Sequence, residues 1–391
     1  MRSWLALAAV LVGGVGPPVS VAAQFGRYGT HSGQFDEPFG IAVVKSTGAV
    51  YVLDSNNHRI ERFSRDGAFV LAWGWGVADG RTQALQVCRR RCLPGLAGSG
   101  AGELSFAEDV VVDNDPLSPS YNDLYIADIG NHRVEEFSPD GQFIAMYGRG
   151  VNLTNRGRHD AAREDRCPVA SHDRCGAGQP GRGRGQFEFP VEGHLLATGS
   201  DGSLYVGDRS RIERFSSRGA FMSELALSPR TAGVEGEAGG VSGLAVDARG
   251  DLYVIRNAIT GVREYGPRGQ PLRTFDDKGE PAYVEGPTPV LALDGAGHVF
   301  IDEFVDQEHQ IREYDQNGCE LASFDYGTED VLHGMTYSSS NHRLYVLNTN
   351  GNVRPPRAFV RIVTPPSPSL SLGSSVFGWL FNCVEPKTLS W

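Results

Sequence analysis

An acid, an amide, an imidazole and a guanidinium lie within six residues in the stretch DSNNHR, from Asp54 to Arg59. The same spacing returns in DIGNHR, from Asp128 to Arg133. Asp, Asn and His side chains bind metal ions, but they also shape turns. The stretch alone is therefore consistent with a catalytic or metal site and with a structural loop, and the rest of the chain has to decide between them.

Internal repeats provide the decision. The segment 48–74 is matched by 122–148 and, with a shorter loop, by 202–225. Weaker copies follow at 250–275, 297–324 and 342–363, and a further apolar strand precedes each copy. A unit of four short strands with this period predicts one blade of a β-propeller.

The repeated motif resembles the NHL repeat, most specifically in the first two copies, and the third copy keeps its acid. Residues that recur on successive blades are spread around a ring and cannot converge on one ion. We therefore expect the two histidines to serve the loop between the second and third strands, with the acids accepting backbone donors there. A peripheral binding spot is the alternative. The motif residues assigned this structural role are Asp54, Asn57, His58, Arg59, Asp128, Asn131, His132, Arg133 and Asp208.

The number of blades follows from the two ends of the chain. The last copy ends after its third strand, near residue 364, whereas QFGRYGTHSGQF at 24–35 resembles the ends of earlier repeats. The N-terminal segment is thus predicted to supply the outermost strand of the last blade and to cover an open sheet edge. The predicted fold is an all-β, six-bladed β-propeller, as resemblance to NHL propellers also implies.

Two inserts interrupt the repeat, at 75–102 and 149–185. Both connect an outer strand to the next inner strand, so they should emerge on the face that carries His58 and His132. Long insertions on one face of a rigid ring are typical sites of binding.

The cysteines favour disulfides, because the chain begins like an exported protein. We expect local bridges within each insert, although bridges between the inserts, or zinc bound by these thiolates with or without His159 and His172, are alternatives. A bridge between Cys319 and Cys383 would anchor the C-terminal tail. The disulfide candidates are Cys88, Cys92, Cys167, Cys175, Cys319 and Cys383.

Three segments are expected along the chain. Residues 1–23 have a basic start, an apolar run and a small-residue cleavage site, as in a signal peptide. The propeller would occupy 24–364 and a Pro/Ser-rich tail 365–391. We predict a secreted monomer without a transmembrane segment, since the apolar runs are too short to span a bilayer.

The charge distribution bears on the partner. A net charge of −11 argues against a nucleic-acid surface covering the whole protein. The second insert holds eight arginines, but no Phe, Tyr or Trp lies among them to stack on bases. A solvated connection is therefore favoured there over a polyanion site.

An alternative function would use the channel mouth. The residues just before the innermost strands include acids and histidines that are suited to Ca²⁺ or Zn²⁺. NHL-related propellers include peptidyl-hydroxyglycine lyases, which hold zinc with three histidines, and lactonase-type propellers use carboxylates and Asn; this chain shows no such histidine triad. The aligned residues are Phe39, Glu108, Glu192, Ser242, Thr288 and His333, with Asp109 and His194 beside them.

The preferred hypothesis is a binding protein rather than an enzyme. It would be an exported scaffold that recognises a protein or glycan through the face with the two inserts. The alternative is a metal-dependent lyase or hydrolase at the channel mouth, with Glu108, Asp109, Glu192, His194 and His333 as its candidate residues. No cofactor is firmly predicted.

Overall fold

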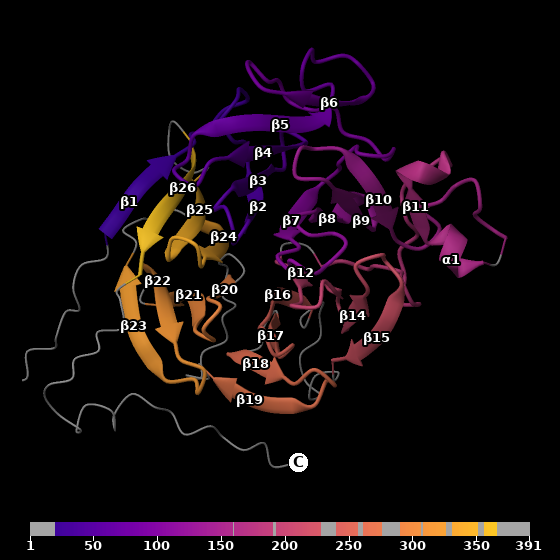
Figure 1. The fold of residues 1–391 in the computed structure, drawn as a ribbon. Coiled ribbons are helices and arrows are strands. Elements are labelled where there is room, and N and C mark those ends of the chain that lie inside the picture. Colours follow the sequence, from indigo (N-terminus) through magenta and orange to yellow (C-terminus); the bar gives the residue numbers. More distant parts are fainter. Residues whose placement is uncertain are drawn as a thin grey trace, which may run out of the picture.

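The computed structural model of the chain is a ring of six β-sheets around a central channel (Figure 1). It describes residues 20–158, 160–190, 193–227, 240–256, 261–275, 290–305, 308–325, 331–350 and 356–365. Neighbouring blades contact each other through their innermost strands, and the last blade contacts the first. The prediction of an all-β, six-bladed propeller is confirmed.

The first three blades follow one another from the N-terminal side. From the channel outward, blade one contains β2 (Pro38–Val43), β3 (Val50–Asp54), β4 (Arg59–Phe63), β5 (Phe69–Trp75) and β6 (Leu85–Cys88). Blade two contains β7 (Ala107–Val112), β8 (Leu124–Asp128), β9 (Arg133–Phe137), β10 (Phe143–Tyr147) and β11 (Arg166–Pro168). Blade three contains β12 (Leu196–Thr198), β13 (Leu204–Gly207), β14 (Arg211–Phe215) and β15 (Phe221–Ala226).

The remaining three blades complete the ring. Blade four contains β16 (Val241–Val246), β17 (Leu252–Arg256), β18 (Val262–Tyr265) and β19 (Pro271–Phe275). Blade five contains β20 (Leu291–Leu293), β21 (Val299–Val305), β22 (Glu308–Tyr314) and β23 (Glu320–Asp325). Blade six contains β24 (Val331–Ser338), β25 (Arg343–Asn350), β26 (Arg357–Thr364) and β1 (Ser20–Phe25). The described helices are short: η1 (Ile129–Asn131), α1 (Ala161–Glu164) and η2 (Val169–Ser171).

The second strand of each blade is rich in Val, Leu, Ile and Tyr because it lies between other strands and between neighbouring blades. Every residue of β3 and β8 is buried. In three blades a tyrosine hydroxyl of this strand donates to a backbone carbonyl in the next blade: Tyr51 to Pro139 at 3.1 Å, Tyr125 to Ser217 at 3.3 Å and Tyr345 to Arg65 at 2.9 Å. These bonds join blades that the apolar core already packs together.

The turn between the third and fourth strands requires glycine for two reasons. Gly141 has a φ of +83°, and a Cβ there would lie 2.6 Å from the Trp73 ring of the preceding blade. Gly219 repeats the arrangement against Tyr147, with a φ of +75°. A left-handed backbone and a close aromatic neighbour both exclude a side chain at these positions.

The N-terminal strand closes the last blade, as predicted. β1 pairs antiparallel with β26, from Ser20 opposite Thr364 to Phe25 opposite Val360. The strand begins before Gln24, where the mature chain was expected to start. Most of the predicted signal peptide lies outside the described residues, as does the predicted tail beyond residue 365, so these boundaries stay predictions.

Each insert contributes a fifth strand, β6 in blade one and β11 in blade two, which the sequence analysis did not predict. Local disulfides join Cys88 to Cys92 and Cys167 to Cys175. These bridges agree with the predicted local pairing, and a cysteine in a disulfide offers no thiolate to a metal. Cys383 and His159 lie outside the described residues, so the bridge from Cys319 stays a prediction. Within the described ranges, no helix has the length and apolar character needed to cross a bilayer.

Candidate functional site

A buried arginine organises the entrance to blade one. Arg59 opens β4 and is fully buried. Its Nε lies 2.9 Å from Asp54 Oδ2, and one Nη lies 3.0 Å from Glu61 Oε1. Its remaining N–H groups donate to four backbone carbonyls, those of Thr30, His31, Gln34 and Leu93. The arginine therefore fixes the chain that leads into the blade, together with part of the first insert.

Blades two and three repeat this arrangement, which we call the arginine clamp: one buried arginine between two acids. The clamps are Asp54, Arg59 and Glu61; Asp128, Arg133 and Glu135; and Asp208, Arg211 and Glu213. The second clamp holds carbonyls of Ser99, Gly100 and Glu103, and the third those of Arg182, Gly183 and Gln186. The third clamp therefore binds backbone carbonyls of the GRGRG segment, which ends the second insert.

Glycine amides complete each clamp. The N–H of Gly33 donates to Glu61, that of Gly102 to Glu135 and that of Gly185 to Glu213, at 3.0 to 3.3 Å. Burial nevertheless raises the pKa of these acids against the opposing effect of the arginine. The pKa of Asp54 rises to about 7, that of Glu135 to about 8 and that of Glu213 to about 7. Because the two acids of a clamp share one guanidinium, the folded state favours protonation of a clamp carboxyl group.

The conspicuous histidines take part through their backbone. His58 and His132 have φ values of +47° and +50°, which turn the chain into the third strand. The Nδ1 atom of each ring is buried and has no hydrogen-bond partner in the described part of the chain. The side-chain bonds of the loop come instead from asparagine: Asn57 donates to Asp54 at 2.8 Å, and Asn131 donates to Asp128 at 2.8 Å.

The acids accept backbone donors, but from the lead-in before the first strand rather than from the loop between the second and third strands. Asp54 Oδ1 accepts the N–H of Asp36 at 2.8 Å, and Asp128 Oδ1 accepts that of Ser105 at 2.9 Å. The geometry agrees with a structural role for the motif. The sequence reasoning missed the acid two residues after each arginine, although the repeated R-I/V-E pattern of the third strands was visible.

The inserts lie on the predicted face. Gly95 N–H of the first insert donates to the carbonyl of Asn57, and Gly178 N–H of the second donates to that of Asn131, at 2.7 and 2.8 Å. Phe106, which follows the first insert, is 71% exposed and has a φ of +49°. The exposed arginines of the inserts are Arg81, Arg89, Arg90, Arg91, Arg156, Arg158, Arg163, Arg174, Arg182 and Arg184.

The strand register corrects one position of the predicted channel mouth. In the ladders of blades two and three, Leu196 is equivalent to Val110. His194 precedes Leu196 by two residues, just as Glu108 precedes Val110 by two. His194 therefore occupies in blade three the place that Glu108 occupies in blade two. Glu192 was placed there from the sequence, two residues too early, because the lead-in to blade three is longer than the lead-in to blade two. It lies outside the described residues.

His194 spans the channel. Its Nε2 lies 2.7 Å from the backbone oxygen of His333, and its Nδ1 lies 3.3 Å from Asp109 Oδ1. Blades three and six face each other across the ring (Figure 1), so the imidazole bridges opposite walls. Burial lowers the pKa of His194, but the bonds to Asp109 and to the carbonyl outweigh it and raise the pKa overall. Burial and the neighbouring His194 lower the pKa of His333 to about 4.

This geometry bears on the metal hypothesis. Both ring nitrogens of His194 are engaged with protein atoms, so neither lone pair is directed at an ion. Glu108 is buried, and Ser242 Oγ is buried with no partner among the described residues. Within the same residues, no group of three or more His, Cys, Asp or Glu side chains is arranged to hold a metal. Thr288, the remaining aligned position, lies outside them.

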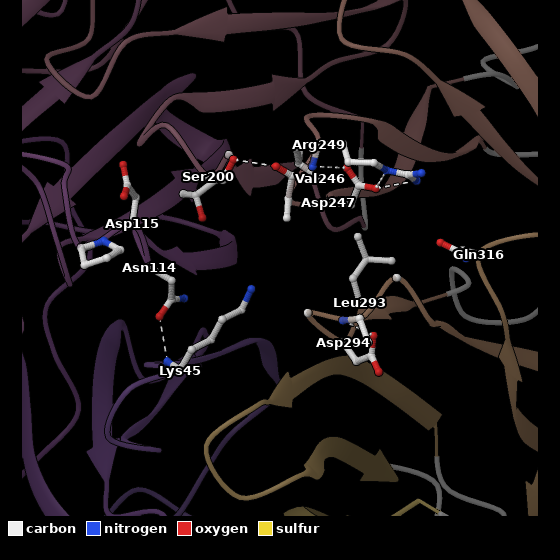
Figure 2. A pocket seen from close by; sticks show the side chains of 17 residues that line it. Lys45, Asn114, Asp115, Ser200, Val246, Asp247, Arg249, Leu293, Asp294 and Gln316 are labelled. Atoms are coloured by element: carbon white, nitrogen blue, oxygen red, sulfur yellow. Dashed lines mark hydrogen bonds and ion pairs between the residues drawn. The ribbon is translucent and has the colours of Figure 1, made fainter. Parts of the chain in front are cut away.

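The opposite end of the channel holds two connected cavities. Below His194 a cavity of about 140 Å³ is lined by apolar residues of the innermost strands, among them Ile41, Val110, Leu196, Leu244, Leu291 and Met335. It shares Lys45, Asn114 and Thr198 with a pocket of about 300 Å³ at the far mouth. Figure 2 shows this pocket, which the first turns of five blades surround. The sequence analysis did not predict this pocket, because its residues lie in turns without a recognisable motif.

A comparison with known protein families agrees with the β-propeller fold. The model of the NHL repeat family matches residues 35–63, which include β2, β3 and β4. The protein is a six-bladed β-propeller that carries an NHL repeat.

Sequence similarity to characterised proteins covers about a third of the chain. Protein brain tumor of Drosophila melanogaster is 28% identical over 142 residues, which are 34% of this chain and 11% of that protein. The mouse peptidyl-glycine alpha-amidating monooxygenase is 28% identical over 141 residues, which are 34% of this chain and 12% of that protein. The matches thus span only a small part of these relatives.

Similar solved structures cover more of the chain at lower identity. Virginiamycin B lyase from Staphylococcus aureus is 12% identical, with a TM-score of 0.48, covering 86% of this chain and 98% of that one. A gluconolactonase from Xanthomonas campestris is 14% identical, with a TM-score of 0.46, covering 93% of this chain and 100% of that one.

Proposed function

We propose that this propeller is an exported binding scaffold that recognises a protein or glycan partner through the insert-bearing face. The arginine clamps carry the proposal. Each clamp fixes the backbone that runs across this face, and the fifth strands and disulfides fix the inserts themselves. A surface ordered before its partner arrives loses less conformational entropy on binding.

The side chains on this face suit recognition. Phe106 is largely exposed although a left-handed backbone costs a non-glycine residue about 1 kcal/mol. Aromatic and arginine side chains are the commonest anchors of protein interfaces. The exposed arginines give this face a positive character on a chain of net charge −11. Export is supported by the two disulfides, which form in oxidising compartments.

A matched pair of exposed residues in blade two tests the proposal. Phe106 lies on the insert-bearing face, and Leu117, which is 91% exposed, lies in the turn between β7 and β8 on the opposite face. Binding would be measured on arrays of neutral glycans, acidic glycans and purified extracellular proteins. Phe106→Ala, and Arg89, Arg90 and Arg91 replaced together by Ala, should each weaken binding about tenfold or more. Leu117→Ala should bind like the unaltered protein, and equal losses in all three variants would reject the assignment of the face.

A further inference from the structure

Lysine is scarce in this protein, and one of its lysines lies at the far mouth of the channel. The chain has 36 cationic residues, of which only Lys45, Lys278 and Lys387 are lysines. Lys45 is the lysine within the described residues. An ammonium group can lose its proton and act as a nucleophile, whereas a guanidinium stays charged. The pocket at the far mouth therefore contains an amine that can act as a nucleophile, which the arginine-rich surfaces lack.

The fold positions Lys45 against the pocket wall. Its backbone N–H donates to Asn114 Oδ1 at 2.7 Å, and Asn114 Nδ2 donates back to the carbonyl of Val43 at 3.2 Å. Figure 2 shows the side chain reaching from this anchor into the pocket. Within the described part of the chain, its Nζ has neither a hydrogen bond nor an ion pair. The amine is thus available to a ligand.

The neighbouring acids are held by their own turns. Asp247 Oδ1 accepts the N–H groups of Arg249 and Asp251, both at 2.9 Å. Asp294 Oδ1 accepts those of Ala296 and His298, both at 2.8 Å. These carboxylates cannot easily turn to pair with the lysine.

The charge of the pocket selects the class of ligand. Its lining has two cations, Lys45 and Arg249, and three acids, Asp115, Asp247 and Asp294. Such a lining repels anions, but it offers acceptors and donors to the hydroxyl groups of a neutral molecule. Lys45 is exposed as a whole residue, but the pocket walls partly desolvate its amine and lower its pKa against the charge of Asp294, so more of the amine is neutral near pH 7. A volume of about 300 Å³ is at the small end for ligand pockets.

We propose that this pocket binds small neutral hydroxyaldehydes, from triose to hexose size, and that the Lys45 amine condenses reversibly with their carbonyl carbon. The Nζ lone pair forms a C–N bond as the C=O π bond breaks, and the nitrogen gives up a proton while the oxygen takes one up, giving a neutral carbinolamine. Protonation and loss of that hydroxyl as water gives the protonated imine, and hydrolysis reverses the sequence. The reaction needs no oxidant or reductant, and it is independent of the insert-bearing face.

The three lysines make the test internally controlled. The intact protein would be incubated briefly at pH 7 with glyceraldehyde and cyanoborohydride, which reduces an imine to a stable secondary amine. Peptides containing Lys45, Lys278 and Lys387 would then be quantified by mass spectrometry. We expect Lys45 to be modified at least ten times faster than the other two. Equal rates at all three lysines would overturn the proposal.

Two further measurements separate binding from mere exposure. The pH profile of modification should have a lower midpoint for Lys45 than for Lys278 and Lys387, and a shared midpoint would also overturn the proposal. Glyoxylate, an anionic aldehyde, should show no preference for Lys45, and a preference as strong as that of glyceraldehyde would contradict the selection for neutral ligands. Lys45→Arg keeps the cation and should abolish the fast phase without changing the melting temperature.

Discussion

Blades one to three and blades four to six use the same strand plan but different chemistry at the entrance of the third strand. The first three place an acid opposite an arginine there, as in Asp54 opposite Arg59. The ladder-equivalent positions of the third strand in blades four, five and six hold Gly261, Gln310 and Phe359. A four-stranded blade therefore does not require the clamp.

The difference shows what the clamp is for. The segments held by the three clamps are the N-terminal lead-in, the end of the first insert and the end of the second insert. Blade six, which has no clamp, relies on apolar contacts: Phe300 of blade five stacks on Tyr337 with ring centroids 5.6 Å apart. Buried charge thus fixes the lead-in and the inserts of the first three blades, whereas blade six is held by apolar packing.

The most severe test of this comparison removes one clamp. Arg133→Met leaves Asp128 and Glu135 buried without their cation, which typically costs 3–5 kcal/mol. We expect urea unfolding to show a loss of about that size. Gln310→Met, at the equivalent position in blade five, should cost less than about 1 kcal/mol. Similar losses in the two variants would mean that the clamp has no special role.

Closure of blade six provides the next test, because this blade has β1 in place of a clamp. Removing the chain through Tyr28 deletes every pair between β1 and β26 and removes Phe25, whose ring lies 4.7 Å from that of Phe63. The loss should be about 3 kcal/mol, as for a deleted buried aromatic residue. A chain that begins at Gln24, the predicted mature end, keeps Phe25 and should retain most of the stability. Thermal melts of both chains against one that begins at Ser20 would measure this, and a normal melt for the shorter chain would contradict closure by β1.

The clamped half should make the protein less stable as the pH rises. Asp54, Glu135 and Glu213 have pKa values near 7 or 8 in the folded protein and lower values in the unfolded chain. The folded state binds their protons more tightly, so their contribution is full below about pH 4 and is lost as the pH rises to about 8. We expect the free energy of unfolding to fall across this range, by up to about 1.4 kcal/mol per pH unit for each of these acids.

Variants can locate that dependence. Glu135→Gln, which resembles the protonated acid, should flatten the curve of urea midpoint against pH. Asp140→Asn removes an acid that is 67% exposed and whose partner among the described residues is Arg62, so its curve should follow that of the unaltered protein. A curve that Glu135→Gln leaves unchanged would place the titration outside the clamps.

Structural features that repeat along the chain could be predicted from the sequence. Features that depend on strand register or on contacts between repeats could not. Strand composition and the recurring motif predicted six blades and closure by the N-terminal strand. The position of His194 could not be predicted, because it depends on extra residues in the lead-in to β12. The clamps join residues about 25 to 35 positions apart, and only the fold brings Arg59 to the carbonyl of Leu93.

The smallest expected effect concerns the histidines, and it asks whether they matter as rings or as backbone. The tripeptide Asn-His-Arg occurs a third time at 341–343, in the turn between β24 and β25 of blade six, far from any clamp. His342 there has a φ of +53°, close to the +47° of His58 and the +50° of His132. The same local sequence thus gives the same left-handed turn in both halves of the ring. Replacement by Ala should cost about 1 kcal/mol at each of the three sites, whereas replacement by Gly should cost little. Melting curves of the six variants would decide: a large loss for His58→Gly or His132→Gly, with none for His342→Gly, would show that the imidazole itself supports the clamped loops.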